Sequence, residues 1–320
     1  FKADRMQVIY KDHVRRTPAD AYLSDEVRRR PNLSVITGAF VTRIVFAGNV
    51  ATGVEFIKDG KTHLMPVNRE VILSAGTYNT PKILKLSGVG PADELMAHGI
   101  NVIADVPGVG ENLSDHLFVH FRVLAPDGMT YGMPMTATMS DDAINQWRES
   151  KSGPANYFTE NSLGLMGLTD NAQSPDFELV FGFSHGASDD MAEFKNIESL
   201  SDRSGYSIGV VLLQPQSRGN VLLASNDPMD KPIINPNYLA DIRDVETLKA
   251  GVKKVMRMFD SSSIQPYTSI IRINPGATDR EIEEFIRNDA STVFHPIGTA
   301  RIGNLSDPMT VVDSSLRVRG

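Results

Sequence analysis

Alternating apolar and polar residues predict β structure in the first quarter of the chain. Residues 33–75 alternate in this way over several short runs and are rich in β-branched side chains. Turn residues interrupt the pattern twice, which predicts a three-stranded meander. The strands are expected at 33–46, 51–58 and 63–67. The mostly apolar run at 70–75, which ends at Gly76, predicts a further short, buried strand.

Helix signals stand before and after this meander. Thr17 is followed by a proline and, three residues on, by Asp20. This is a capping pattern for a helix that continues to the arginines at 28–30. Two further helices are expected at 80–86 and 91–98, because each begins at a proline and ends before glycine.

The rest of the chain predicts a sheet accompanied by helices. From 116 to 123 the residues alternate strictly, so even and odd positions should lie on opposite faces of a strand. Other strand-like runs lie at 177–184, 206–214 and 220–225. An amphipathic helix is expected at 244–259, and a capping box at Thr278 begins another that reaches Ile286. The inward positions of the longer helix are Val245, Leu248, Val252, Val255, Met256 and Phe259.

Composition narrows the classes of protein to consider. The 320 residues are 41% hydrophobic, enough for one large core or two smaller ones. A net charge of -7 argues against nucleic acid or an anionic membrane surface as a partner, because both require a basic face. No window holds about 18 uninterrupted apolar residues, so no membrane-spanning helix is expected. The absence of cysteine excludes disulfides, thiolate metal sites and a cysteine nucleophile.

One histidine has the setting of a general base. His295 stands between Phe294 and Pro296, and Gly298 follows three residues later. The proline restricts the backbone of the histidine before it, so the imidazole lies on a stiff loop. An unperturbed imidazole titrates near about pH 6.5, which suits proton transfer at physiological pH. The alternative is a histidine that is buried and hydrogen-bonded for packing alone.

Two other histidine patterns do not predict a site. His116 and His120 have the spacing of a helical metal pair, but the alternation predicts a strand and the acidic residue of such a motif is missing. Ser114, Asp115 and His116 are adjacent, whereas a hydrolase triad is assembled from separated positions. We therefore expect neither a metal site nor a hydrolase triad.

Three longer motifs resemble the glucose-methanol-choline (GMC) oxidoreductases. The run at 76–90 matches the second signature of that family position by position, and the run at 107–116 is similar to another typical stretch. The segments 294–299 and 311–320 resemble the C-terminal catalytic region, with the closest likeness to aryl-alcohol oxidases. The resemblance covers essentially the whole chain.

The resemblance implies a mixed α/β (α+β) fold. Residues 1–115 would form part of an FAD-binding, Rossmann-like domain that contains the meander. Residues 116–290 would form a substrate-binding domain of antiparallel sheet with helices, and 291–320 would return to the first domain. A strand that runs into a glycine turn and a helix, as expected at 70–86, is how α/β folds place a nucleotide.

The resemblance also implies a reaction. In the family, the histidine that matches His295 takes the hydroxyl proton of an alcohol while a hydride passes to flavin N5. Phe294 would lie beside the substrate, although a phenylalanine of the core is the alternative reading. The residues expected to contact FAD are Val41, Gly76, Asn112 and Asp313. The expected partners are a small-molecule primary alcohol and an electron acceptor, oxygen or a quinone, and the family resemblance implies a secreted protein.

The chain departs from the family pattern at both ends. It has no G-x-G-x-x-G turn for the FAD pyrophosphate, and it stops at Gly320, before the second catalytic residue of the family. We therefore expect a fragment that is completed by its missing segments, with FAD bound by the complete protein and its retention by this chain left open. The alternatives are a hydroxynitrile lyase of the same fold, or a non-catalytic fragment or interaction protein without cofactor.

Overall fold

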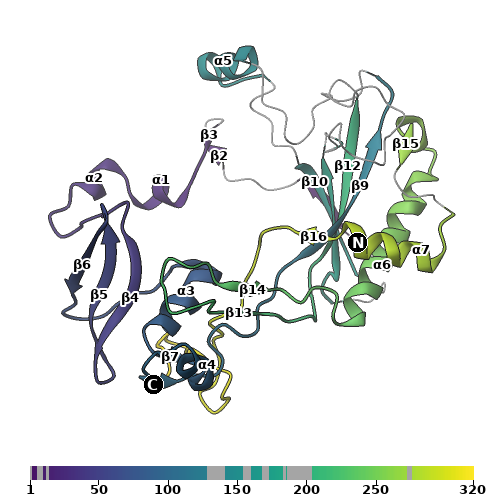
Figure 1. The fold of residues 1–320 in the computed structure, drawn as a ribbon. Helices are drawn as coiled ribbons and strands as arrows, with labels where there is room; N and C mark the ends of the chain where they lie inside the picture. Colours follow the sequence, from purple (N-terminus) through teal and green to yellow (C-terminus); the bar gives the residue numbers. More distant parts are fainter. Residues whose placement is uncertain are drawn as a thin grey trace. The chain divides into compact units, whose positions relative to one another are not determined.

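The computed structural model divides the chain into two compact units (Figure 1). It describes residues 2–5, 10–11, 14–127, 141–153, 160–167, 173–182, 185, 204–271 and 276–320. Unit 1 consists of Phe1–Ser34, His116–Gln214 and Ile242–Val293. Unit 2 consists of Val35–Asp115, Pro215–Asp241 and Phe294–Gly320.

Unit 1 includes two stretches that we assigned from the sequence to other domains. Residues 1–34 belong to it, and β1 (Lys2–Arg5) pairs antiparallel with β10 (Glu160–Met166). The final return to unit 2 begins at Phe294 rather than three residues earlier, because β16 (Ser291–Thr292) is still a strand of the unit 1 sheet.

Unit 2 includes the segment Pro215–Asp241, which we assigned from the sequence to the substrate domain. Two short strands of this segment, β13 (Asn220–Leu222) and β14 (Ile233–Asn235), pair antiparallel. The backbone of Gly219 exchanges two hydrogen bonds with that of Leu113, with N···O distances of 2.9 and 2.8 Å. These bonds fasten the segment to unit 2.

The expected meander is confirmed in unit 2. It consists of β4 (Phe40–Ala47), β5 (Val50–Lys58) and β6 (Lys61–Pro66), paired antiparallel in sequence order. Its first strand begins at Phe40, later than the alternation suggested. Beside it, α3 (Gly76–Leu86) is fixed to β4, since the Ser87 hydroxyl accepts the N–H of Ile44 at 2.8 Å.

A small core holds the remaining elements of unit 2 together. The chain leaves α3 through β7 (Val89–Gly90), α4 (Ala92–Ala97) and β8 (Ala104–Asp105), and the two strands pair in parallel. The α4 helix agrees with the helix expected at 91–98. The buried residues of this core are Leu84, Val89, Val106, Val109 and Val311.

The strand expected at 70–75 is wrong. No described strand pairs with this segment, and the side chain of Ile72 is 81% exposed. A strand needs a neighbour for its backbone N–H and C=O groups. The apolar run alone does not supply that neighbour, and the segment leads as an unpaired stretch into α3.

Two helix boundaries also differ from expectation. The helix expected to begin at Thr80 starts at Gly76, so Pro81 lies inside α3. The single helix expected after Thr17 is two short ones, α1 (Pro18–Tyr22) and α2 (Asp25–Arg28). The Thr17 capping box is present, but the Ser24 hydroxyl accepts the N–H of Val27 and caps a second helix of its own. Before them, β2 (Tyr10–Lys11) pairs with β3 (Val14–Arg15).

Unit 1 is built on an antiparallel sheet. The strand order is β1, β10, β11 (Phe177–Gly182), β12 (Gly205–Leu212), β9 (Leu117–Leu124) and β15 (Ile270–Ile271), and β16 also pairs with β9. Odd positions of β9 are buried and even positions are half-buried up to Arg122, which confirms the alternation. Residues 183–184 of the run expected to end at 184 lie outside the described residues.

Helices cover one face of this sheet. The long helix α6 (Ile242–Phe259) packs on β9, β11 and β12, and α7 (Asp279–Asp289) packs on α6 and β9 (Figure 1). All six expected inward residues of α6 are buried. The other described helices of unit 1 are α1, α2, α5 (Asp141–Ser150) and the 3-10 turn η3 (Gln265–Tyr267). Within the described residues, no helix combines the length and apolar character needed to cross a membrane.

A buried lysine makes a first prediction possible. The Lys85 ammonium group, with a side chain 1% exposed, donates to Glu94 Oε2 at 2.7 Å and to the Val221 carbonyl at 2.8 Å. Replacing Lys85 with Met leaves the Glu94 carboxylate and this carbonyl without their donor, and should lower the free energy of unfolding by about 3 kcal/mol. Urea denaturation measures this loss. Lys61→Met, at an exposed position of β6, is the control, and equal losses in both variants would contradict the assignment.

The half-buried residue His120 makes a second prediction possible. Burial, and secondarily the charge of Arg122, lowers the pKa of His120 to about 4. Because the unfolded chain then binds the extra proton, the free energy of unfolding should fall by up to roughly 3 kcal/mol as the pH drops from about 6.5 to about 4. His120→Asn should lose this part of the pH dependence in urea titrations across that window. An unchanged dependence would show that His120 is not its source.

Candidate active site

The loop 294–299, called the His295 loop below, leaves an antiparallel backbone ladder. Ser114 and Ile297 exchange hydrogen bonds with N···O distances of 2.9 and 2.8 Å, and further along the same two stretches Leu117 pairs with Thr292. Two residues separate these pairs on one stretch and four on the other. The two extra residues give the chain room to carry Phe294 and His295 out of the ladder.

The backbone at Phe294 is strained. Its φ angle is 63°, in the left-handed region that a bulky L-residue adopts only at a cost of about 1–2 kcal/mol. The phenylalanine side chain is 82% exposed, and His295 is exposed as well. Such conformations persist where surrounding contacts determine them, and they gather at functional sites.

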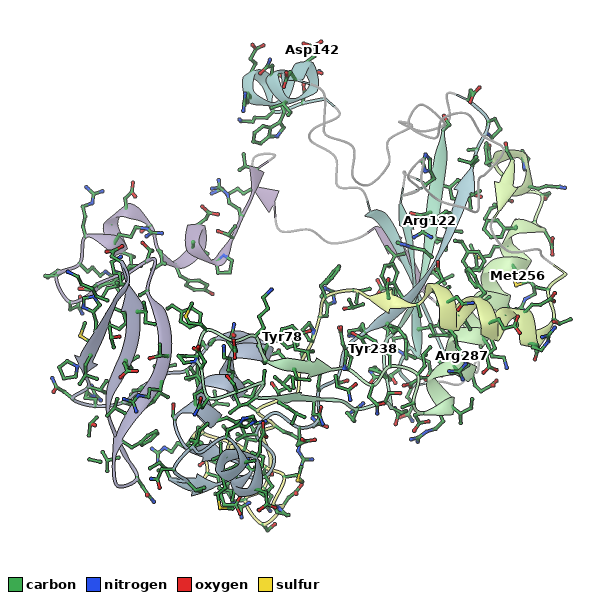
Figure 2. All side chains as sticks on the ribbon, in the orientation of Figure 1. Tyr78, Arg122, Asp142, Tyr238, Met256 and Arg287 are labelled. Carbon is green, nitrogen blue, oxygen red and sulfur yellow. The ribbon has the colours of Figure 1, made fainter. Side chains whose placement is uncertain are left out.

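The Asp115 carboxylate provides the first of these contacts. Asp115 is only 5% exposed, and its Oδ1 accepts the backbone N–H of His295 at 3.0 Å. Its Oδ2 accepts the hydroxyl of Tyr238 at 2.6 Å (Tyr238 and Tyr78 are labelled in Figure 2). Burial, and secondarily the negative charge of Asp115, raises the pKa of Tyr78. The carboxylate therefore lies among one backbone donor and two tyrosines of the same unit.

The first turn of α3 provides the second set of contacts. The Thr77 hydroxyl donates to the Pro296 carbonyl at 2.6 Å, and the Thr299 hydroxyl donates to the Thr77 carbonyl at 2.6 Å. In a regular helix the Thr77 carbonyl would accept the N–H of residue 81, but Pro81 has none. The proline thus leaves free a helical carbonyl that the His295 loop uses.

Asn112 provides the third contact. Its side-chain amide donates to the Gly298 carbonyl at 3.3 Å, and both residues have positive φ angles. A Cβ atom at Gly298 would come within 2.3 Å of the Asn112 carbonyl oxygen, so only glycine fits there. The close approach holds the end of the His295 loop against 110–115, where the Gly110 N–H also donates to the Thr299 carbonyl at 2.9 Å.

The structure brings together some of the predicted site residues and not others. Asn112 contacts the His295 loop, and Gly76 precedes Thr77, which contacts it too. Val41 lies half-buried in β4, and no described hydrogen bond connects its backbone or side chain to this loop. The Asp313 carboxylate accepts the N–H groups of Ser315 and Arg317 and closes its own turn.

The N-terminus of α3 fits an electron-rich group such as part of a flavin. Gly76 has a φ angle of 82°, and a Cβ atom there would have nothing within 4 Å. The residue before it, Ala75, gives the helix no side-chain cap. The first N–H groups of the helix therefore carry partial positive charge beside an open surface, and both features favour acceptor atoms of a ligand.

Sequence reasoning missed four residues of this arrangement: Thr77, Asp115, Tyr238 and Thr299. Asp115 and Tyr238 stand more than a hundred positions apart, so no local pattern could connect them. Pro81 was the one available signal, because a proline four residues after Thr77 leaves that carbonyl without a helical donor. Within the described part of the chain, no group of three His, Asp or Glu side chains is arranged to hold a metal ion.

The fold combines an antiparallel sheet covered by helices with an α/β unit that presents an exposed histidine. This combination is consistent with the oxidoreductase class that the motifs resemble. Two family models, both described as GMC oxidoreductase, match residues 4–118 and 215–320, and together they cover more than half of the chain. The chain belongs to the GMC oxidoreductase family. Proteins of this family are FAD-dependent and act on alcohol groups, which agrees with the resemblance found in the motifs.

Known relatives match nearly the whole of this chain but only about half of their own length. An alcohol dehydrogenase [acceptor] from Pseudomonas putida is 35% identical over 98% of this chain and 56% of its own length. The solved structure of pyridoxine 4-oxidase from Mesorbium loti is 26% identical, covers 99% of this chain and 57% of that chain, and superposes with a TM-score of 0.81. The chain thus spans about half the length of the relatives it matches, and its mixed fold is confirmed.

The expected likeness to aryl-alcohol oxidases is not singled out by these matches. The structure of a fungal aryl-alcohol oxidase is 24% identical, covers 92% of this chain and 56% of that chain, and has a TM-score of 0.75. At this identity the likeness concerns the fold alone. The family is therefore established, whereas these matches do not identify the substrate.

The Thr299–Thr77 bond makes a third prediction possible. Thr299→Val removes the hydroxyl that donates to the carbonyl left without a helical donor by Pro81, and should lower the free energy of unfolding by about 1–2 kcal/mol. Thr299→Ser, which keeps the hydroxyl, is the control. In a Pro81→Ala background the new N–H supplies the helical bond, so the valine should cost clearly less. Equal costs of the valine in both backgrounds, measured by urea denaturation, would contradict this account of the helix.

Proposed function

We propose that the complete protein oxidises a primary alcohol to an aldehyde with FAD, and that His295 is the general base. The observation that carries this proposal is the setting of His295. Its side chain is exposed, while its backbone is held by the buried Asp115 carboxylate and by the Ser114–Ile297 pair next to it. A base on a fixed backbone can meet a substrate hydroxyl in one reproducible geometry.

The chemistry requires a base because an alcohol carbon is a poor hydride donor until the hydroxyl proton is leaving. The His295 imidazole accepts that proton through a nitrogen lone pair. A base within hydrogen-bonding reach contributes about 10²–10⁴-fold to the rate of such a step. Bound flavin supplies the hydride acceptor. Oxygen or a quinone then takes the electrons, which agrees with the word acceptor in the name of the bacterial relative.

Phe294 supports the finer proposal of an aromatic alcohol. Its ring is 82% exposed on the residue next to the base, and the left-handed backbone keeps it there. An exposed aromatic ring beside a reacting group can stack on an aromatic substrate or meet it edge to face. We therefore infer that the substrate is a primary alcohol next to an aromatic ring, in the manner of aryl-alcohol oxidases.

Two of the predicted cofactor residues support the flavin assignment better than the other two. Gly76 opens the uncapped N-terminus of α3, and Asn112 lies against the His295 loop. Both belong to the same group of hydrogen-bonded segments as His295. Val41 and Asp313 lie elsewhere in unit 2, and their part in binding the cofactor rests on the family resemblance.

The fourth prediction concerns His295 in the full-length, FAD-loaded protein. His295→Gln removes the base, so anaerobic reduction of the flavin by benzyl alcohol should slow by about 10²–10⁴-fold. Stopped-flow absorbance of the flavin measures the rate, and the spectrum before mixing shows that FAD is still bound. His63→Gln, at an exposed position of β6, is the matched control and should reduce at the wild-type rate.

Two results would contradict the proposal. Reduction of the His295→Gln variant at the wild-type rate would remove the histidine from the chemistry. Cleavage of a cyanohydrin by the wild type without any alcohol-dependent bleaching of the flavin would make the protein a lyase. Comparison of benzyl alcohol with n-butanol tests the aromatic preference separately, because only benzyl alcohol can stack on Phe294.

A further inference from the structure

We propose that Asp115 and Tyr238 form a clamp that sets the position of His295, which makes both of them positioning residues for the reaction. This inference rests on the proposed function, because it assigns a task to the backbone of the residue named there as the base. The clamp is the set of two hydrogen bonds from His295 N–H to Asp115 Oδ1, 3.0 Å, and from Tyr238 Oη to Asp115 Oδ2, 2.6 Å.

The backbone N–H of His295 needs an acceptor. The loop leaves the antiparallel ladder at this residue, so the N–H no longer faces a strand carbonyl of the Ser114–Ile297 pair. A carboxylate is a stronger acceptor than a carbonyl, because a hydrogen bond to a charged group is about twice as strong as a neutral one. Asp115 therefore holds His295, the residue after the strained Phe294, in place.

Asp115 is buried. With 5% of its surface exposed, the carboxylate has lost most of its contact with water, and such a loss costs several kcal/mol unless donors replace the water. One of the donors is the N–H of His295 and another is the hydroxyl of Tyr238. The Asp115 carboxylate is therefore hydrogen-bonded to the residue that carries the base. Packing alone would not require this bond.

Tyr238 fixes the orientation of the Asp115 carboxylate. Its hydroxyl fixes the second oxygen of the carboxylate, so the plane of the carboxylate is set by two bonds in place of one. Tyr238 follows Asn237, whose side chain donates to the Arg218 carbonyl at 3.0 Å, and Asn237 has a positive φ angle of 54°. The tyrosine thus stands on a turn that is itself fixed, and it transmits that fixed position through Asp115 to His295.

The clamp holds the backbone N–H of His295. If the clamp is loosened, the alcohol should bind nearly as before, while the base reaches the hydroxyl less often in the productive geometry. Displacement of a reacting group by about 1 Å can cost about 10²-fold in rate. The effect should therefore fall on the rate constant of flavin reduction and spare the dissociation constant of the alcohol.

The test uses the full-length, FAD-loaded protein, with benzyl alcohol as the reductant in anaerobic stopped-flow experiments. Tyr238→Phe should slow reduction by about tenfold and Asp115→Ala by about 10²-fold, while the dissociation constant stays within about twofold. Asp115→Asn keeps an acceptor for the His295 N–H and should recover most of the rate lost in the alanine variant. Tyr22→Phe, at a highly exposed tyrosine of α1, is the matched control.

A double variant separates positioning through His295 from a general structural effect. In a His295→Gln background the clamp has no base left to position, so adding Asp115→Ala should slow reduction no further. An additional tenfold loss there would overturn the clamp. Wild-type rates in Tyr238→Phe together with a slow His295→Gln variant would also overturn it while leaving the base role intact. If Asp115→Ala fails to fold, Tyr238→Phe takes its place: it should slow reduction by about tenfold alone and no further in the His295→Gln background.

A wild-type rate for His295→Gln would refute the proposed function itself, and the clamp with it. That result differs from the others because it appears in the single histidine variant, before any change at Asp115 or Tyr238.

Discussion

The antiparallel hydrogen-bonded pair between Ser114 and Ile297 is the constraint on which the candidate site depends. It brings two segments together that are far apart in the sequence, and it fixes where the ladder ends. The next residues on one side, Phe294 and His295, can leave the ladder only because the opposite stretch is two residues shorter. The same pair places Asp115 where its carboxylate meets the His295 N–H. A strained, exposed loop and a buried carboxylate are thus two consequences of one register.

The first turn of α3 shows how a local irregularity serves a distant segment. Pro81 removes one N–H from the helix, and the carbonyl of Thr77 is thereby available to Thr299. Thr77 in turn donates its hydroxyl to Pro296, so bonds run in both directions between the helix and the loop. A proline inside a helix normally weakens it, but here the lost bond is replaced by a side-chain bond of 2.6 Å. This replacement is the reason why the helix can begin before its proline.

Sequence patterns predicted the elements whose own residues reveal which face is buried. The alternation at β9 and the apolar stripe of α6 are of this kind, and both were right because one face of each element is buried. The strand expected at 70–75 failed because a strand also needs a neighbour, which an apolar run does not reveal. The start of α3 was missed because its stabilising partner, Thr299, lies far away in the sequence.

The candidate site was predictable only where its residues are contiguous. His295 and Phe294 were proposed from the sequence because they stand together in one motif, whereas Tyr238 is connected to the same loop through its hydrogen bond to Asp115. A crystal structure of the full-length protein with FAD and a bound alcohol would show directly whether His295 is the base. We expect an imidazole nitrogen of His295 within about 3 Å of the alcohol oxygen, with the His295 N–H still bonded to Asp115. An imidazole turned away from the alcohol, with another side chain in contact with its hydroxyl, would contradict it.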